Sequence, residues 1–314
     1  MKLRTTLAVI AVAAVTAPVA AQSITNPDGT PNPAYEGLYG WFKADGMVMN
    51  GKAPAGEGEQ ITAWLDSSDN GRNLIRTSGD ANRRPVFAAD GGSGMPAVEF
   101  DGDDFIWANQ TTEFGTISTA RTIFAVVRPD AANGGYVFDS CTSAGRNALF
   151  TGQASNPEEW VAYTGTATIG CGGVSVDETV LVSMTLETGA QSIRINGKEV
   201  AAATEGLQDL PGMLLGARYT TTNGFDGAIS EVMVYAEAVA GDDLEAITSY
   251  LSDKYGLGAD CTADVNGDGM VDSADLGLIL GAWGTADPLF DLNGNGAVDG
   301  ADIGVLVAQW GPCV

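Results

Sequence analysis

FDGAISEVMVYAEAVAGDDLEAITSYLSDKYGL, from Phe225 to Leu257, is the stretch of sequence that decides the fold. Its first half holds a run of apolar and β-branched residues, Ile229–Tyr235, which predicts a strand. Apolar residues then recur at helical spacing: Leu244, Ile247 and Leu251. Gly256 stands where a glycine commonly ends a helix. The stretch therefore predicts a buried strand followed by one helix that closes a domain.

Upstream of this stretch the chain has the composition of an all-β domain. Short runs rich in β-branched and aromatic residues recur between glycine, asparagine and aspartate: Thr122–Arg128, Tyr136–Phe138, Thr179–Leu186 and Ser192–Ile195. Asn196-Gly197 suits the positive φ angles of a type I′ hairpin turn. Residues 34–257 are therefore expected to form one two-sheet sandwich or jelly roll rather than several small domains.

Three further phrases carry a family resemblance. They are GLYGWFKADG (37–46), WLDSSDNGRN (64–73) and RPVFAADGGSGMPAVEFDGDD (84–104). Together with the closing strand and helix, they resemble a LamG-like jelly roll of the concanavalin A-like lectin/glucanase superfamily. The resemblance implies a mainly β sandwich, a fold that serves lectins, adhesion modules and glycosidases alike. A glycan is the partner it implies.

Catalytic residues are not predicted. The chain has no histidine, which excludes Ser-His-Asp and Cys-His chemistry and His-ligated zinc. Glycoside hydrolysis needs only two carboxylates, but no strand carries the ExDxxE-like pattern of the glycosidases in this superfamily. Glu57 and Glu59 in a glycine-rich loop, and Glu158 and Glu159 after a proline, are interpreted as solvated loop charge. A glycoside hydrolase remains the alternative function.

Two other groups in the sandwich leave alternatives open. Asp101, Asp103 and Asp104 in FDGDD can bind a cation at a loop tip or simply form a tight turn between strands. Three tryptophans can stack on sugar rings or fill the core: Trp64, Trp107 and Trp160. The sequence does not separate these readings.

The C-terminal region contains a duplicated pattern of twelve residues. It reads DVNGDGMVDSAD from Asp264 to Asp275 and DLNGNGAVDGAD from Asp291 to Asp302, 27 residues later. Both copies place oxygen-bearing side chains at positions 1, 3, 5, 9 and 12 and glycine at position 6, as a calcium loop requires. The predicted ligands are Asp264, Asn266, Asp268, Met270 (through its carbonyl), Asp272 and Asp275, then Asp291, Asn293, Asn295, Ala297 (through its carbonyl), Asp299 and Asp302. Ordinary surface turns share this composition, but the repetition favours two Ca²⁺ sites.

Each loop leads into a predicted helix with an apolar stripe. The stripes are Leu276, Ile279, Leu280 and Trp283, and 27 residues later Ile303, Leu306, Val307 and Trp310. Val271 and Val298, at position 8 of the two loops, are expected to anchor each loop to a core. The two copies should therefore pack on each other, and calcium binding should be coupled to folding.

Residues 260–314 resemble a type I dockerin, a small all-α calcium-binding module that docks secreted enzymes onto cohesin-bearing scaffolds. Two departures concern the docking surface. Loop positions 10 and 11, usually hydroxyl residues, are Ser273-Ala274 and Gly300-Ala301, and the region from 259 onward lacks Lys and Arg. The resemblance therefore implies calcium binding more strongly than a cohesin-like partner.

The first 21 residues are interpreted as a secretory signal, and residues 22–33 as a linker. Lys2 and Arg4 precede an apolar segment from Leu7 to Val15, and Val19-Ala20-Ala21 fits a cleavage site. A secreted protein is expected to form disulfides. Three connectivities are open for the four cysteines, and Cys141–Cys171 with Cys261–Cys313 is the favoured pairing.

The charge balance excludes some partners. The chain has 15 basic and 40 acidic residues and a net charge of −25. Such a surface repels nucleic acid and anionic membranes, and no segment outside the signal is long and apolar enough to enter a bilayer. The sequence thus predicts a secreted calcium-binding protein with a glycan-binding or adhesive sandwich. A hydrolase and a purely structural matrix or envelope protein are the alternatives.

Overall fold

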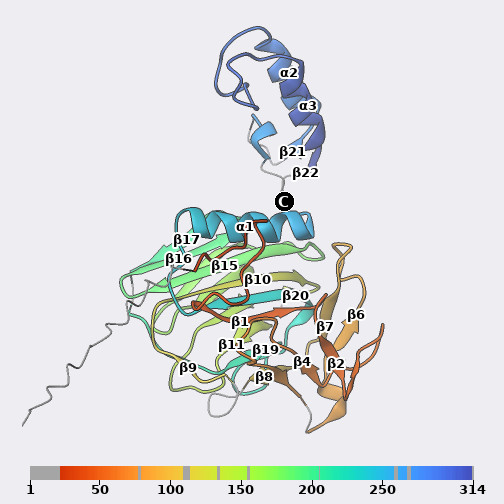
Figure 1. Ribbon diagram of the computed structural model, residues 1–314, viewed down its shortest axis with the longest axis vertical. Coiled ribbons are helices and arrows are strands. Elements are labelled where there is room, and N and C mark those ends of the chain that lie inside the picture. Colours follow the sequence, from red (N-terminus) through yellow and green to blue (C-terminus); the bar gives the residue numbers. More distant parts are fainter. Residues whose placement is uncertain are drawn as a thin grey trace, which may run out of the picture.

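A computed structural model of the chain describes residues 22–76, 79–108, 114–132, 135–153, 156–204, 206–257, 261–266 and 270–312 (Figure 1). The predicted signal segment 1–21, Asp268 and Cys313 lie outside the described residues.

Within these residues, two antiparallel sheets form a sandwich. The eight-stranded sheet has the order β17 (Lys198–Ala203), β16 (Ala190–Ile195), β15 (Val180–Glu187), β10 (Arg121–Pro129), β20 (Asp226–Tyr235), β7 (Ala97–Asp101) and β6 (Val86–Ala88), with β1 (Leu38–Lys43) also pairing with β20. The ten-stranded sheet has the order β14 (Thr168–Gly173), β13 (Asn156–Tyr163), β12 (Ala148–Gln153), β11 (Tyr136–Asp139), β19 (Met213–Leu215), β8 (Ile106–Ala108), β5 (Leu74–Ile75), β4 (Ala63–Trp64), β2 (Val48–Asn50) and β3 (Ala53–Pro54). The remaining short elements of this domain are η1 (Ala81–Arg83), β9 (Thr116–Ile117) and β18 (Leu210–Pro211), the last two paired with each other. The mainly β sandwich predicted from the sequence is confirmed.

The alternation of side chains along the strands explains how the layers stack. In β10, Ile123 and Ala125 point into the core between the two sheets. Their neighbours Phe124 and Val126 point to the opposite face, where they meet the apolar side of α1 (Asp242–Tyr255). Both faces of the eight-stranded sheet are therefore buried at β10, which is why this strand is a nearly continuous apolar run.

Helix α1 covers the outer face of the eight-stranded sheet, as Figure 1 shows. The predicted stripe is buried, and Gly256 ends the helix in the left-handed conformation at φ 63°. The predicted hairpin turn is also present, with Asn196 at φ 48° and Gly197 at φ 80° between β16 and β17. These features were predictable because each depends on a few neighbouring residues.

The C-terminal module consists of η2 (Cys261–Ala263), β21 (Met270–Val271), α2 (Ser273–Gly281), α3 (Gly300–Ala308) and β22 (Gly311–Pro312). Its core is separate from the sandwich core and includes both position-8 valines, Val271 and Val298, which are fully buried as predicted. Beside its helices the module has a short antiparallel ladder of β21 and β22, which an all-α module would lack.

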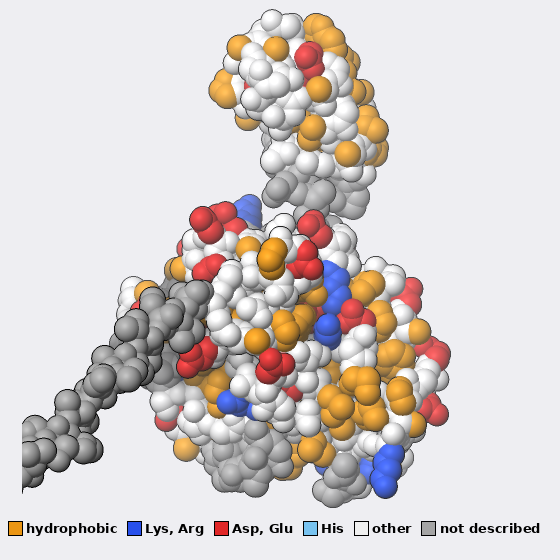
Figure 2. Space-filling view, viewed as in Figure 1, with side chains coloured by type: hydrophobic (Ala, Val, Ile, Leu, Met, Phe, Trp, Pro, Cys, Tyr) orange, Lys and Arg blue, Asp and Glu red, His pale blue; other side chains and the backbone are white. Residues whose placement is uncertain are grey.

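The predicted helical stripes are buried only in part. Ile279 and Leu306 are fully buried, and Leu276 and Ile303 pack against the same core. The other four stripe residues are about half exposed: Leu280, Trp283, Val307 and Trp310. The prediction fails there partly because α2 ends at Gly281 and α3 at Ala308. Trp283 and Trp310 follow these ends, so helical spacing does not put them on the same face as the buried stripe residues. Figure 2 shows hydrophobic side chains gathering on the surface of this module.

The helices of the described segments are too short or too polar to cross a membrane.

Candidate carbohydrate-binding face and calcium loops

The outer face of the ten-stranded sheet is built by the same alternation that fills the core. In β13, Trp160 and Ala162 point into the sandwich, whereas Val161 and Tyr163 point outward. On the neighbouring strands the outward residues Tyr136 and Phe150 stack with ring centroids 4.5 Å apart and planes 15° apart. Among the described residues, the apolar cluster on this face consists of strand residues alone: Tyr136, Ala148, Phe150, Val161 and Tyr163.

An ion pair lies on this face. Arg146 donates from Nη2 to Oδ2 of Asp139 at 2.6 Å and from Nε to Oδ1 at 3.1 Å, a two-pronged arrangement that fixes the guanidinium plane. The Asp139 side chain is fully buried, and that of Arg146 is 12% exposed. The backbone N–H groups of Ser140 and Tyr219 also donate to this carboxylate, at 2.8 and 3.1 Å. Asp139 is thus held rigidly from three sides.

Burial and hydrogen bonding shift the pKa values of Asp139 and Arg146 in opposite directions. Burial raises the pKa of Asp139, although the bonds from Arg146 and the two N–H groups work in the opposite direction. For Arg146, burial favours a lower pKa, but the hydrogen bond and charge of Asp139 outweigh it and the pKa is raised. The guanidinium therefore stays charged, and its charge is matched locally by the carboxylate.

Three tyrosines surround the Arg146 guanidinium. Its central carbon lies 4.7 Å from the ring centroid of Tyr219, 4.9 Å from that of Tyr163 and 5.8 Å from that of Tyr136. Each tyrosine is partly exposed. Cation–π contacts of this kind orient aromatic rings around a fixed cation.

Strand register extends the cluster to a tryptophan. Asp139 pairs with Leu214, and Leu214 pairs with Trp107, so the three residues form one row across β11, β19 and β8. Trp107 is 37% exposed and makes an edge contact with Phe105, 6.2 Å between centroids. At the usual strand spacing, Trp107 and Asp139 are about 10 Å apart, which is the scale of two sugar rings. We call Trp107, Tyr136, Tyr163, Tyr219, Arg146 and Asp139 the aromatic face.

The structure places two of the three candidate tryptophans in the core. Trp64 and Trp160 are core residues with at most 1% exposure, and only Trp107 is on the surface. Glu57 and Glu59 do lie in a loop, but the loop assignment of Glu158 and Glu159 is wrong, because both belong to β13. The sequence did not indicate the other residues of the aromatic face: Tyr136, Tyr163, Tyr219, Arg146 and Asp139. The only signal for them was the predicted strand Tyr136–Phe138, whose alternation places Tyr136 on one face.

The cysteine prediction also requires a correction. Cys141 donates to the carbonyl of Ala108 at 3.4 Å and packs in the outer cluster of Phe105 and Leu214. Cys171 donates to the carbonyl of Ile169 at 3.2 Å and belongs to the central core. The Cys141–Cys171 disulfide is not formed, since the two thiols belong to different clusters. Cys261–Cys313 cannot be compared, because Cys313 lies outside the described residues.

The two C-terminal loops repeat one hydrogen-bond pattern. In the first, Asp275 accepts from the N–H of Asn266 at 3.2 Å and of Asp272 at 2.9 Å. Twenty-seven residues later, Asp302 accepts from the N–H of Asn293 at 3.2 Å and of Asp299 at 2.7 Å. Asp272 and Asp299 in turn cap α2 and α3, forming a capping box in both copies. The aspartate at position 12 thus hydrogen-bonds both to its loop and to the first residue before its helix.

The second loop is described along its whole length and turns its oxygens inward. Asp291 accepts from the N–H of Asn295 at 3.1 Å and of Gly296 at 2.7 Å. Asn293 accepts from Asn295 at 2.9 Å, and Asn295 from Ala297 at 3.0 Å. Gly296 has φ 92°, the conformation that glycine tolerates best. The backbone N–H of Asp299, and after it that of Asn293, lowers the pKa of Asp302, which keeps this group ionised.

The predicted donor set fits a hard cation, because every side chain in it offers oxygen rather than nitrogen or sulfur. Within the described residues, the carboxylates of Asp291, Asp299 and Asp302 do not gather within 4.8 Å of one another. Calcium in the second loop would therefore also need the neutral oxygens of Asn293, Asn295 and Ala297.

Comparison with protein families finds a match within the sandwich. Residues 100–245 match the family model Laminin_G_3, described as the concanavalin A-like lectin/glucanases superfamily. Residues 100–245 of the β-sandwich are therefore similar to the concanavalin A-like lectin/glucanase class. The C-terminal module lies outside the matched residues, and no curated protein matches the chain in a sequence search.

Similar solved structures include carbohydrate-active proteins. A Trypanosoma rangeli sialidase in complex with 2,3-difluoro-KDN shares 15% identity and a TM-score of 0.47, over 75% of this chain but only 36% of the sialidase. Domain 4 of AbnA, a GH43 extracellular arabinanase from Geobacillus stearothermophilus, in complex with arabinotriose, shares 15% identity and a TM-score of 0.46, over 68% of this chain and 97% of that domain. A GH54 α-L-arabinofuranosidase shares 13% identity and a TM-score of 0.50, over 62% of this chain and 51% of its own. At such low identity the similarity concerns the fold alone.

Proposed function

We propose that the sandwich binds a glycan on the aromatic face. The row of Trp107, Leu214 and Asp139 across three strands is the observation that carries this proposal. Exposed aromatic rings suit the apolar faces of sugar rings, and the guanidinium of Arg146, held in place by buried Asp139, offers a donor to hydroxyl groups. The face is rigid before binding, so little ordering opposes association.

The charges favour an uncharged glycan. Arg146 is already matched by Asp139 at 2.6 Å, so it offers no net positive charge to a carboxylated or sulfated sugar. The chain as a whole has 40 acidic against 15 basic residues, and this excess repels polyanions. A neutral polysaccharide is the ligand that the aromatic face fits.

The second proposed activity is calcium binding by the C-terminal module. Its support is the identical hydrogen-bond pattern at position 12 of both loops, together with the inward-turned oxygens of the second loop. Bound Ca²⁺ would be held by the twelve ligands named from the sequence, and it would offset the repulsion between their carboxylates. The first loop has four carboxylates and the second three, so the first site should bind more tightly.

The module also serves, in this proposal, to attach the exported sandwich to a larger assembly. Four half-exposed apolar residues offer a dockerin-like docking surface for a cohesin-like partner: Leu280, Trp283, Val307 and Trp310. The ends of the module are already close together, because Gln309 bonds the Ala263 N–H at 3.0 Å and Thr262 at 3.1 Å. This contact supports a Cys261–Cys313 bridge in an oxidising compartment.

Affinity electrophoresis of the full chain in gels containing single polysaccharides tests the glycan proposal. Neutral arabinan, xylan, galactan, mannan and β-glucan are compared with acidic pectate and hyaluronate. We expect retardation by a neutral polysaccharide, at least tenfold weaker binding for Trp107→Ala, and no change for Trp310→Ala, which removes a similarly exposed tryptophan from the other module.

Other outcomes would favour the alternatives. Reproducible release of reducing ends from a polysaccharide would indicate a glycoside hydrolase. Saturable self-association without retardation by any polysaccharide would indicate a structural protein and would refute glycan binding.

A further inference from the structure

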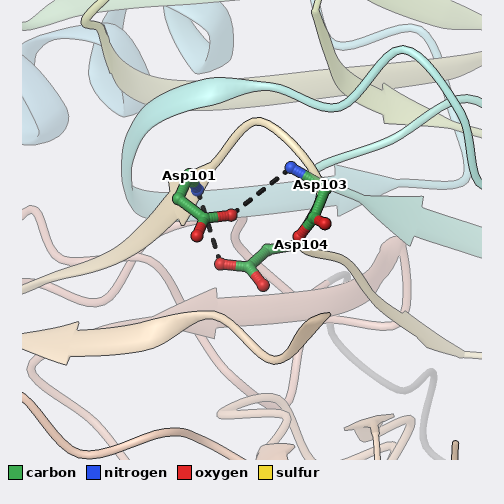
Figure 3. Close-up of side chains that lie close together, drawn as sticks. All are labelled: Asp101, Asp103 and Asp104. Atoms are coloured by element: carbon green, nitrogen blue, oxygen red, sulfur yellow. Dashed lines mark hydrogen bonds between the residues drawn. The ribbon is translucent and has the colours of Figure 1, made fainter. Parts of the chain in front are cut away.

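A second acidic site lies on the sandwich, at the turn that follows β7. Asp101, Asp103 and Asp104 each offer a carboxylate oxygen, and these three oxygens lie within 4.8 Å of one another. Figure 3 shows the three side chains facing one another around this turn. In the part of the chain that the structure describes, no other trio of Cys, Asp and Glu side chains comes so close. We call these residues the acidic turn.

The contacts within the acidic turn do not neutralise its charge. The N–H of Asp103 reaches Asp101, and the N–H of Asp101 reaches Asp104, both at a long 3.4 Å. None of the ion pairs found among the described residues involves the three carboxylates. The nearby Arg83 donates instead to the backbone carbonyls of Asp103 and Thr221, at 2.9 and 2.6 Å. The charge of Asp104 also acts on Arg76, and Arg84 lines the same cavity as Asp101 and Asp104. Three carboxylates nevertheless share a small space, and a bound cation would relieve their mutual repulsion.

Asp104 supplies the observation that points to a ligand. Its side chain is only 3% exposed, and its Oδ1 is buried with no hydrogen-bond partner. Buried carboxylate oxygens are normally hydrogen-bonded or bound to a metal. Asp104 also lines a cavity of about 330 Å³ together with Asp101, Asp130 and Asp226.

We propose that Asp101, Asp103 and Asp104 bind a calcium ion at the edge of this cavity. The three side chains offer only oxygen, which suits a hard divalent cation and not a thiolate- or imidazole-seeking metal. Calcium fits better than magnesium because it accepts several carboxylates in irregular geometry, whereas magnesium retains most of its water.

The surrounding backbone holds the ligands in place. Gly102 donates its N–H to the carbonyl of Phe225 at 2.9 Å, and Asp101 pairs with Asp226 between β7 and β20. Gly224 lies so close to Gly102 that a Cβ there would collide with the Gly102 carbonyl. The turn is therefore clamped to the neighbouring segment before any ion arrives, and binding requires little reorganisation.

This site is independent of the two C-terminal loops, and the experiment separates them. Equilibrium dialysis with Ca²⁺ is performed on the full chain and on a chain carrying Asp275→Asn and Asp302→Asn, which disables position 12 of both loops. We expect the loop-disabled chain to retain one bound Ca²⁺, competed poorly by Mg²⁺. If the C-terminal loops bind no Ca²⁺, the unmodified chain and the loop-disabled chain each bind one ion. Failure of the loop proposal is thus distinguished from failure of the acidic-turn proposal.

Substitutions in the loop-disabled chain then assign the remaining ion. Asp104→Asn should weaken its binding at least tenfold, and Asp103→Asn, at an exposed position that does not threaten folding, should weaken it as well. The control Asp90→Asn changes another exposed acidic turn, whose carboxylate only accepts from Gly92 and Gly94, and should have no effect. A loop-disabled chain that binds no Ca²⁺, or binding unchanged by both Asp104→Asn and Asp103→Asn, would overturn the proposal.

Discussion

Replacing Arg146 by methionine should destabilise the sandwich through a single buried contact. Methionine retains much of the apolar volume but removes the charge that faces Asp139 at 2.6 Å. The carboxylate is fully buried and cannot reach water without disturbing the sheet. The variant therefore leaves an uncompensated charge inside the protein.

The size of the effect follows from what Asp139 retains. Removing one partner of a buried ion pair typically costs about 3–5 kcal/mol. Asp139 keeps its bonds from the N–H groups of Ser140 and Tyr219, so we expect the lower end, about 3 kcal/mol. For a domain of this size, that loss lowers Tm by about 6–12 °C.

The loss should also depend on pH. The pKa of Asp139 is raised in the folded protein by burial, and removal of Arg146 raises it further. A carboxyl group with a raised folded pKa stabilises the fold fully below its unfolded pKa, and that stability is lost as the pH rises through the folded pKa. Arg146→Met should therefore be less destabilised at about pH 4.5 than at about pH 7.5 relative to the wild type.

Urea unfolding followed by tryptophan fluorescence measures this loss, since Trp64 and Trp160 are buried in the sandwich core. The double variant Arg146→Met/Asp139→Asn should recover much of the lost stability, because no charge remains buried. A loss below about 0.5 kcal/mol for Arg146→Met, or a double variant less stable than the single one, would refute the reasoning.

Three further results are expected. Removing calcium with EDTA should expose the C-terminal module to protease while a fragment ending near residue 257 persists, and equal digestion with and without Ca²⁺ would contradict coupled folding. In the calcium-bound module, Ile279→Ala should cost about 3 kcal/mol, because Ile279 is fully buried, and half-exposed Leu280→Ala about 0.5 kcal/mol, measured by thermal unfolding; equal losses would show that the core is misassigned. Iodoacetamide added after unfolding without reductant should label both Cys141 and Cys171. If neither cysteine is labelled, the two form a disulfide and the correction made above is wrong. In the native protein Cys171 should react slowly, because burial raises its pKa to about 11.

Local sequence signals predicted those parts of the fold that depend on neighbouring residues. The stripe of α1 with Gly256 at its end, and the Asn196-Gly197 turn, each lie within one short segment. The calcium-loop pattern is equally contiguous, so a full set of ligands could be predicted without a structure, and that set stays a prediction. The helical stripes of the C-terminal module were extended too far, since Trp283 and Trp310 follow the last helical residues.

The aromatic face could not be predicted, because its residues come from distant parts of the chain. Trp107 and Asp139 meet in one row only through Leu214, on a strand about 75 residues beyond Asp139. That row depends on the register of three strands, and register is set by non-local pairing. The two-residue strands β4 and β5 are likewise too short to give a periodic signal.

Hydrogen–deuterium exchange on the full chain tests most directly the claim that glycan binding and calcium binding are assigned to different modules. The polysaccharide that retards the chain most, added as a soluble oligosaccharide, should protect amides of β8, β11, β13 and the segment around Tyr219. Ca²⁺ should protect residues 291–302 without changing those strands. Glycan-dependent protection confined to α1 or to the C-terminal module, with the aromatic face unchanged, would contradict the account.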